Sequence, residues 1–335
     1  MKSVVVSPFA ALIALALWPA QQAFAQAFGE PAPLVRAFRN PEVERAASER
    51  PVDAHGHDHD HAHGRGHDHG VESEIIFGFT LGSDTHPSGE NKLAVETVAR
   101  LGKLTSHYVA VGQKLEFSHT FTNDLSMSFT LLGDYHRISA RRGYEAEVEP
   151  VAGRYLFNGF GGELRYRFLN RATSPFGLTL HMEPSLAFSD EASGLRGRKY
   201  GSENKLIFDR EVIKDTFFAA FNLTHEMEMT KEKGAAAWER GTVVGASVAG
   251  SWHVAKNLFL GAETRYLRAY EGLSLATYRG DAVYVGPTLT LIKGASFMNL
   301  AYSGLVGGKE KGSSGGLDLV NFERHHIRLK AGFHF

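Results

Sequence analysis

The amino-acid sequence predicts an all-β fold, a transmembrane antiparallel up-and-down β-barrel of about 12 strands, preceded by a signal peptide and a disordered His-rich arm. Three observations predict the barrel. From about residue 72 onward, segments of roughly ten residues alternate apolar and polar side chains, which is the period of two-faced strands. The connectors between these segments alternate between short turns and long polar loops. The last segment ends in an aromatic residue, Phe335.

The beginning of the chain is typical of a secretory signal peptide. Lys2 precedes an apolar run from Val4 to Trp18 that is too short to span a bilayer, and Ala23 and Ala25 supply small residues for cleavage. We therefore expect residues 1–25 to be removed during export. A single N-terminal anchor helix is the alternative, although no stop-transfer flank follows the run.

Residues 26–71 are predicted to form a disordered periplasmic arm, because their Pro, Ala, Arg, Glu, His, Asp and Gly residues offer too little apolar surface to offset the entropy of ordering. Within the arm, residues 55–69 form a tract of alternating histidines. In an extended chain, alternate residues project to the same side, so their imidazoles can share one divalent ion. The candidate metal ligands of the tract are His55, His57, Asp58, His59, Asp60, His61, His63, His67, Asp68 and His69.

The tract is expected to hold metal loosely. Neutral imidazole suits Zn, Ni, Cu and Co, and a chain without fixed geometry would exchange such ions rather than keep one as a tightly bound cofactor. A polar linker with no metal role is the alternative. Four further histidines occupy strand positions that are expected to face the lumen: His181, His253, His326 and His334. They are candidate sites for passing on metal ions released by the arm. The alternative is that each is solvated or ion-paired, which is more common for such histidines.

Residues 72–335 are predicted to form the barrel itself. In the last segment, Ile327, Leu329 and Phe333 are expected to face lipid. The intervening Arg328 and Lys330 are expected to face the lumen. A soluble exported β-sandwich would also alternate in this way, but the long succession of hairpins favours the barrel.

The connectors give the strand count. Counting from residue 92 to residue 335 gives about twelve strands, an even number that returns both ends of the barrel to the periplasm. Residues 75–81 remain open as either an extra strand or a periplasmic latch. Short turns are expected at 122–124, 170–174, 213–215, 255–257 and 293–295, and long loops at 139–153, 189–202, 231–240, 271–280 and 307–319.

The charged phase of the strands predicts a lumen of mixed sign. Such a lumen is either a water-filled pore or a closed interior neutralised by ion pairs, and charge identity alone does not choose between them. The expected lumen-lining residues are Glu96, Arg100, Lys114, Glu116, Glu163, Arg165, Arg167, Glu183, Glu263, Arg265, Arg328 and Lys330.

Composition and motifs exclude several function classes. The 36 basic and 37 acidic residues nearly cancel, so no global field favours nucleic acid, and the absence of cysteine removes thiol chemistry and disulfides. The sequence contains no G-x-S-x-G segment, no His-Glu-x-x-His segment and no phosphate loop. Ser118 and His119 are adjacent, but neighbours on a strand point to opposite faces and cannot act as nucleophile and base. We therefore expect a protein that is not an enzyme.

Several segments resemble a known group of proteins. Residues 76–84 (IFGFTLGSD), 88–90 (SGE), 114–117 (KLEF) and 122–124 (TND) resemble uncharacterised proteobacterial outer-membrane proteins. That group is similar to the barrels labelled as phenol-degradation meta-pathway outer-membrane proteins. The resemblance covers most of residues 74–335, and it implies a barrel of the transport type in the outer membrane of a Gram-negative bacterium. It offers no substrate and no catalytic residues.

Together these features predict a channel for small solutes, with the arm concentrating divalent metal, zinc-like in its chemistry, at a periplasmic mouth. One alternative is a closed structural barrel that displays the arm as a metal buffer or sensor, and a less favoured one is an outer-membrane lipid hydrolase. The N-terminal arm and the C-terminus are expected on the periplasmic side. The expected partners are outer-membrane lipid, the barrel-assembly machinery acting on the strand that ends at Phe335, and a small-molecule or metal-ion solute, with no nucleic acid.

Overall fold

The computed structural model describes residues 71–314 and 316–335. The predicted signal peptide and the histidine tract at residues 55–69, with all of its candidate metal ligands, lie outside the described residues. No helix in the described part of the chain is long and apolar enough to cross a membrane.

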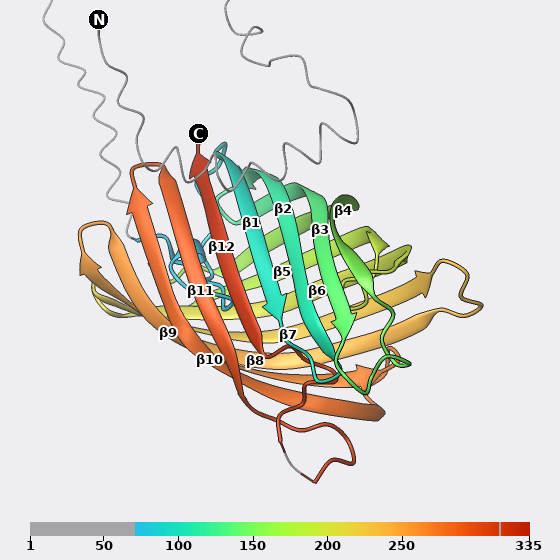
Figure 1. The fold of residues 1–335 in the computed structure, drawn as a ribbon. Helices are drawn as coiled ribbons and strands as arrows, with labels where there is room; N and C mark the ends of the chain where they lie inside the picture. The colour runs from blue at the N-terminus through green and yellow to red at the C-terminus, as the bar shows by residue number, and fades with distance from the viewer. Residues whose placement is uncertain (1–70, 315) are drawn as a thin grey trace, which may run out of the picture.

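The described residues form a closed barrel of twelve strands, which confirms the predicted fold class (Figure 1). Each strand pairs antiparallel with its neighbours in the sequence. The first strand also pairs with the last, from Lys92 opposite His334 to Leu101 opposite His325, and this pairing closes the sheet. The strands are β1 (Asn91–Leu101), β2 (Ser106–Thr122), β3 (Leu125–Ala140), β4 (Val151–Leu169), β5 (Gly177–Ser189), β6 (Arg196–Ile213), β7 (Phe217–Glu232), β8 (Glu239–Ala255), β9 (Leu258–Glu271), β10 (Thr277–Lys293), β11 (Ser296–Gly307) and β12 (His325–His334).

The alternation of side chains gives the barrel an apolar exterior and a polar interior. In β12, Ile327 is exposed on the outside whereas Arg328 on the inside is buried. The same pattern puts Phe129 of β3 and Leu260 of β9 among the exposed apolar side chains of the outer face. An apolar outer band around a polar lumen is the arrangement that lipid on one side and water on the other require.

The two ends of the barrel differ. Most strands are joined by short turns at the end that carries the C-terminus, which we call the turn end, and most connectors at the opposite loop end are longer (Figure 1). The exceptions are the longer connector 170–176 at the turn end and the short connector 102–105 at the loop end. One expected loop was too long: β5 continues to Ser189 and β6 already begins at Arg196, so most of residues 189–202 lie in strands. Their polar composition hid the strands because their charged side chains face a polar lumen rather than solvent.

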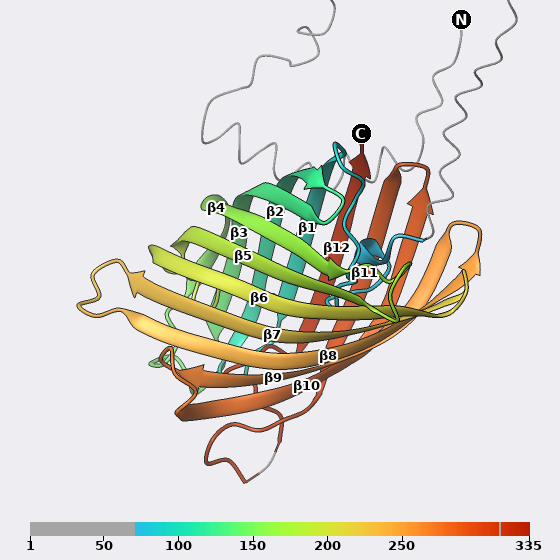
Figure 2. The ribbon, with the colours of Figure 1, turned by 180° about the vertical axis from the view of Figure 1, so that it is seen from behind.

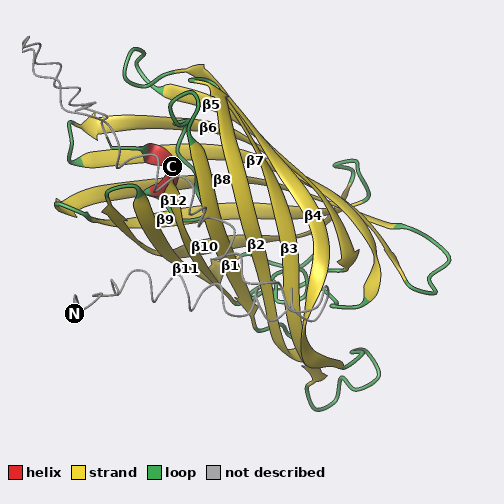
Figure 3. Ribbon diagram, turned by 90° about the horizontal axis from the view of Figure 1, so that it is seen from above, coloured by secondary structure: helices red, strands yellow, loops and turns green. Residues whose placement is uncertain are grey.

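The segment before β1 lies inside the barrel. Residues 71–90, here called the plug, contain one short 3-10 helix, η2 (Ser73–Ile75), and then an extended stretch within the ring of strands (Figures 2 and 3). Of the two alternatives left open for residues 75–81, the extra strand is therefore wrong, and the segment lies inside the barrel at its turn end. This stretch pairs with no strand edge, because the closed sheet leaves none, and it bonds instead to side chains that point inward.

Candidate functional site

A cavity of about 440 Å³ lies within the barrel, between the plug and two connectors at the loop end. The plug contributes Glu74, Phe79 and Leu81 to its lining, and the connectors contribute Glu191 and Glu323. The remaining lining comes mostly from inward side chains of the wall. Among the charged side chains that line the cavity, carboxylates outnumber lysines and arginines.

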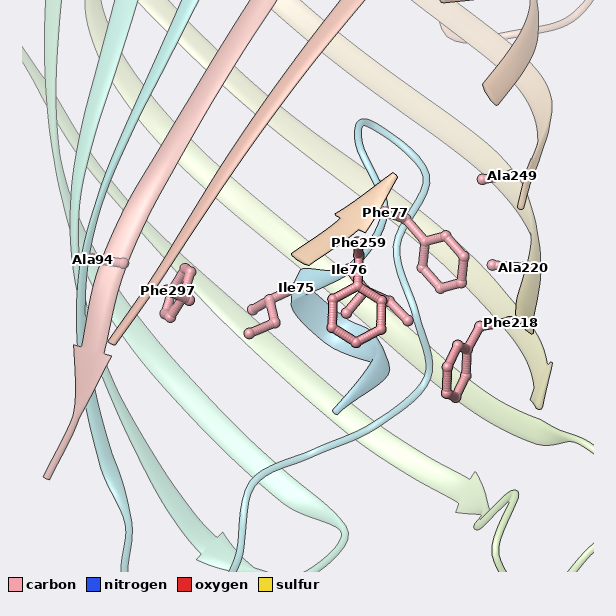
Figure 4. Packing of buried hydrophobic residues seen from close by; sticks show 9 residues of the cluster. All are labelled: Ile75, Ile76, Phe77, Ala94, Phe218, Ala220, Ala249, Phe259 and Phe297. Carbon is pink, nitrogen blue, oxygen red and sulfur yellow. The ribbon is translucent and has the colours of Figure 1, made fainter. Parts of the chain in front are cut away.

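The plug is anchored first by apolar contacts. Ile75, Ile76 and Phe77 pack at the turn end against small and aromatic side chains from the wall (Figure 4). Ile76 and Phe77 are almost completely buried. Burial of a side chain of this size contributes about 1.5–3 kcal/mol, so this contact holds the plug in place. The wall residues of the cluster are Ala94, Phe218, Ala220, Ala249, Phe259 and Phe297.

Wall side chains also satisfy the plug's backbone. The carboxylate of Glu263 accepts hydrogen bonds from the backbone N–H groups of Phe79 (3.1 Å) and Thr80 (2.9 Å). The amide of Asn222 both accepts from the Leu81 N–H (2.7 Å) and donates to the Leu81 carbonyl (2.9 Å). Because a buried backbone group without a partner is costly, these wall residues take the place of a strand partner.

Three further wall side chains bond to plug carbonyl groups. The guanidinium of Arg165 donates to the carbonyl oxygen of Gly82 at 2.7 Å, and that of Arg328 donates to the carbonyl oxygen of Gly78 at 2.5 Å. The amide of Asn299 donates to the carbonyl oxygen of Phe77 at 2.7 Å. Three of the predicted lumen residues, Glu263, Arg165 and Arg328, thus hold the plug.

The plug passes very close to the wall at Gly78. A Cβ atom there would lie 2.7 Å from Thr288 Cγ2, 2.8 Å from Glu263 Oε1 and 2.9 Å from Ala301 Cβ. Only a residue without a side chain leaves room for this close approach, which explains why residue 78 is a glycine.

An ionic cluster fixes the plug at the turn end. Lys92 of β1 is buried and contacts Glu74 of the plug at 2.6 Å and Glu116 of β2 at 3.0 Å. His86 lies 2.5 Å from Glu72 and 2.8 Å from Glu74, all three within the plug. Burial alone would lower the pKa of His86, but the two carboxylates outweigh burial and raise the pKa of His86 to about 9.

The charged side chains that were predicted to face the lumen pair with one another inside the barrel. Glu96 binds Arg328 at 2.7 Å, Glu116 binds Lys330 at 3.0 Å, and Lys114 pairs with Glu183. Most of the predicted residues, including these, line the cavity. Charge pairing lets a narrow lumen hold both signs without leaving an isolated buried charge.

Two predicted lumen residues point inward but do not line the cavity. Glu263 bonds the plug as described above. Arg167 lies at the turn end, where its Nε contacts Asp124 at 3.0 Å. Three others not yet placed do line it: Arg100 pairs with Glu191, Glu163 lies 3.6 Å from His181, and Arg265 stacks over the ring of Phe79 at 3.9 Å.

The four lumen-phase histidines lie in four separate sets of contacts. His181 sits between Glu163 and Glu183, and His326 contacts Glu323. His253 contacts the Asp215 carbonyl at the turn end, and His334 packs against His86. The structure therefore does not bring them together.

Two connectors reach into the loop end of the lumen. Glu191, in the connector 190–195, pairs with Arg100, and its carbonyl accepts a hydrogen bond from the Tyr108 hydroxyl at 3.1 Å. Glu323, in the connector 308–324, contacts Lys103 at 3.2 Å. The pairing with Arg100 lowers the pKa of Glu191 to about 2. For Glu323, burial is outweighed by Lys103, so its pKa lies below its ordinary range.

Sequence reasoning missed the plug and its partners. Asn222 and Asn299 are uncharged and were therefore not considered as lumen residues. The signal that could have revealed the plug is the run of three apolar residues, 75–77, followed by the glycines Gly78 and Gly82. Such a run follows neither the two-residue period of a strand nor the 3.6-residue period of a helix. It fits an irregular segment that is enclosed on all sides.

The serine–histidine pair considered for catalysis does not form a reacting pair. The Ser118 hydroxyl donates weakly to the Met127 carbonyl at 3.4 Å, whereas His119 bonds Asn91. Ser118 is buried on the inner face, and His119, as the next residue on the strand, points to the other face.

The sequence model of a family of unknown function, DUF6662, matches residues 69–335, which span the plug and the whole barrel. The chain belongs to this family. No curated protein sequence matches the chain. The resemblance to the phenol-degradation meta-pathway proteins stays a prediction.

Solved structures of outer-membrane barrels resemble the fold. An outer membrane channel of the COG4313 group from Pseudomonas putida F1 has a TM-score of 0.50 and 13% identity, over 76% of this chain and 98% of that chain. LpxR from Salmonella typhimurium has a TM-score of 0.41 and 12% identity, over 73% of this chain and 100% of that chain. The β domain of the Bordetella autotransporter BrkA has a TM-score of 0.47 and 11% identity, over 74% of this chain and 100% of that chain. At such identities the likeness concerns the fold.

Proposed function

We propose that this protein is an outer-membrane channel for small polar solutes whose conductance the plug restricts. One observation carries the proposal: a closed barrel surrounds a cavity of about 440 Å³ that is lined largely by charged side chains. A purely structural barrel would gain more stability from a packed apolar core than from ion pairs in a cavity. The similarity in fold to a solved outer membrane channel supports the proposal.

The orientation follows from the two kinds of connector. In outer-membrane barrels short turns face the periplasm and long loops face the exterior. The turn end, with Phe335 and the plug, would then be periplasmic, and the predicted histidine tract would extend into the same compartment.

The test compares the conductance of the full mature chain with that of a variant whose plug no longer fits. Gly78→Val introduces a side chain where even a Cβ atom would overlap the wall, so we expect the plug to shift and conductance in planar bilayers to rise severalfold. Gly307→Ala is the matched control, because its Cβ would meet only ordinary contacts, 3.7 Å from Val283 Cβ, and the residue does not line the cavity.

Channels of small conductance in the unaltered protein, enlarged by Gly78→Val and unchanged by Gly307→Ala, are the expected result. A correctly folded barrel that gives no conductance in any of the three forms contradicts the channel. That outcome would favour the second candidate, a closed barrel that displays the histidine tract, which the dense apolar contacts of the plug support.

A further inference from the structure

We propose that Glu72, His86 and His334 form a binding site for a divalent transition-metal ion that fastens the plug to the last strand of the barrel. One ligand atom from each residue lies within 4.8 Å of the other two. Glu72 and His86 belong to the plug, whereas His334 is the last residue of β12. An ion bound here would therefore join the two ends of the described chain.

The contacts among these side chains are already close to those of a metal site. His86 Nδ1 lies 2.5 Å from Glu72 Oε1, and the rings of His86 and His334 meet edge to face with centroids 4.2 Å apart. A zinc ion held at about 2.0–2.2 Å from nitrogen and oxygen ligands needs ligand atoms roughly 3–3.5 Å apart. Small rotations of three side chains would reach this geometry.

The surrounding charges favour a cation with two positive charges. Glu74 Oε2 lies 2.8 Å from His86, and Glu90 Oε1 lies 2.9 Å from His334. An ion that takes a lone pair from each imidazole displaces the proton that His86 shares with Glu72 and Glu74, so metal binding at this site competes with protonation. Two nitrogens with carboxylate oxygens are the donor set that zinc prefers, with copper, nickel and cobalt as competitors.

One histidine atom of the cluster lacks a partner. Nε2 of His334 is buried and makes no hydrogen bond within the described part of the chain, although buried imidazole nitrogens normally have partners. The side chain of His334 is only 9% exposed, whereas that of Glu72 is 31% exposed. An ion could therefore enter past Glu72 and reach an enclosed pair of imidazoles.

A second cluster of metal-ligating side chains is a weaker candidate. Glu163, His181 and Glu183 also lie within 4.8 Å of one another in the lumen. That cluster offers only one imidazole, and the ammonium group of Lys114 already neutralises Glu183. The cluster at the plug has two imidazoles, and Lys92 contacts Glu74 rather than its three ligands.

The site lies close in the sequence to the predicted histidine tract, which could supply it with metal. His69, the last histidine of the predicted tract, is separated from Glu72 by two residues. Since an extended residue spans about 3.3–3.6 Å, the backbone at His69 is tethered within roughly 11 Å of that at Glu72. A tract that binds ions weakly would raise their local concentration at a fixed site so close along the chain.

The experiment must separate the site from the tract. In the full mature chain folded in detergent, all histidines of the tract are changed to alanine, and zinc binding is measured by titration calorimetry. We expect one zinc ion to remain bound. In the same background, His334→Ala and Glu72→Gln should each weaken zinc binding by about tenfold or more.

His107→Ala is the matched control, because His107 is an exposed histidine on β2, and we expect it to leave zinc binding unchanged. Heat-dependent gel mobility checks that each variant forms a folded barrel. Because Glu72 is partly exposed, its variant should fold even if one at His334 does not. The proposal is overturned if the tract-free protein binds no stoichiometric zinc, or if folded His334→Ala and Glu72→Gln proteins bind it as tightly as the background. Neither result affects the conductance test of the channel.

Discussion

At the scale of single residues, the wall side chains that hold the plug act as substitutes for a backbone partner. Glu263 is the clearest case, because one buried carboxylate accepts from two successive N–H groups, those of Phe79 and Thr80. Charge-assisted hydrogen bonds of this kind are stronger than neutral ones. The residue is needed because the plug has no strand edge to pair with.

Glu263→Ala should therefore loosen the plug without opening the barrel. Two buried N–H groups would lose their acceptor, at a cost of about 1–3 kcal/mol for each. We expect faster hydrogen exchange at the amides of Phe79 and Thr80, measured by mass spectrometry of the folded protein. Glu271→Ala, at the exposed end of the same strand, is the control. Unchanged exchange in Glu263→Ala would mean that apolar packing alone holds the segment.

At the scale of elements, the connectors 190–195 and 308–324 are held over the loop end by ion pairs. Arg100 holds Glu191, and Lys103 holds Glu323. The pKa values of both carboxylates lie below their ordinary value of 4.5, that of Glu191 at about 2. A group with a lowered pKa stabilises the closed arrangement above its ordinary pKa and loses that contribution as the pH falls toward the lowered value.

Acidification should therefore release these connectors. Between pH 4.5 and about 2 we expect conductance to rise, because protonation of Glu191 removes its attraction to Arg100. The Glu191 side chain is 43% exposed, so solvent screens the pair and the rise should be modest.

Arg100→Gln should raise conductance already at pH 6 and flatten the response to acid. Lys309→Gln, an exposed change in the second connector, serves as the control and should keep the response of the unaltered protein. Equal pH responses in all three proteins would show that other lumen groups, not this pair, control conductance.

At the scale of the whole molecule, the closed barrel gathers more carboxylates than lysines and arginines around one cavity. Glu226 lines this cavity and forms no ion pair with a basic side chain among the described residues. The residue opposite Glu226 on the neighbouring strand β6 is another glutamate, Glu203. A lumen lined in this way attracts cations and repels anions.

We therefore expect a cation preference, measured as the reversal potential in a KCl gradient. Glu226→Gln should reduce the preference, because it removes an unpaired carboxylate. Lys205→Gln should increase it, because it frees Glu203 from its 2.6 Å pair with that lysine. An anion preference in the unaltered protein would contradict the assignment of the lumen charge.

The sequence by itself determined the barrel. A strand with lipid on one face and water on the other must alternate, so β12 shows Ile327 outside and Arg328 inside, as its residues predicted. The connectors likewise determined the strand count, because short turns and long loops belong to opposite ends of the barrel. These features depend on residues that are neighbours in the chain.

Only the tertiary structure decided what fills the lumen. The contact of Glu263 with Thr80 joins residues 183 positions apart, and that of Arg328 with Gly78 joins residues 250 apart. No local pattern encodes such pairs, because a plug has no periodicity and its partners are scattered over many strands. The meeting of His86 with His334 has the same cause: closure of the barrel brings the last strand back to β1, and the plug that precedes β1 returns with it.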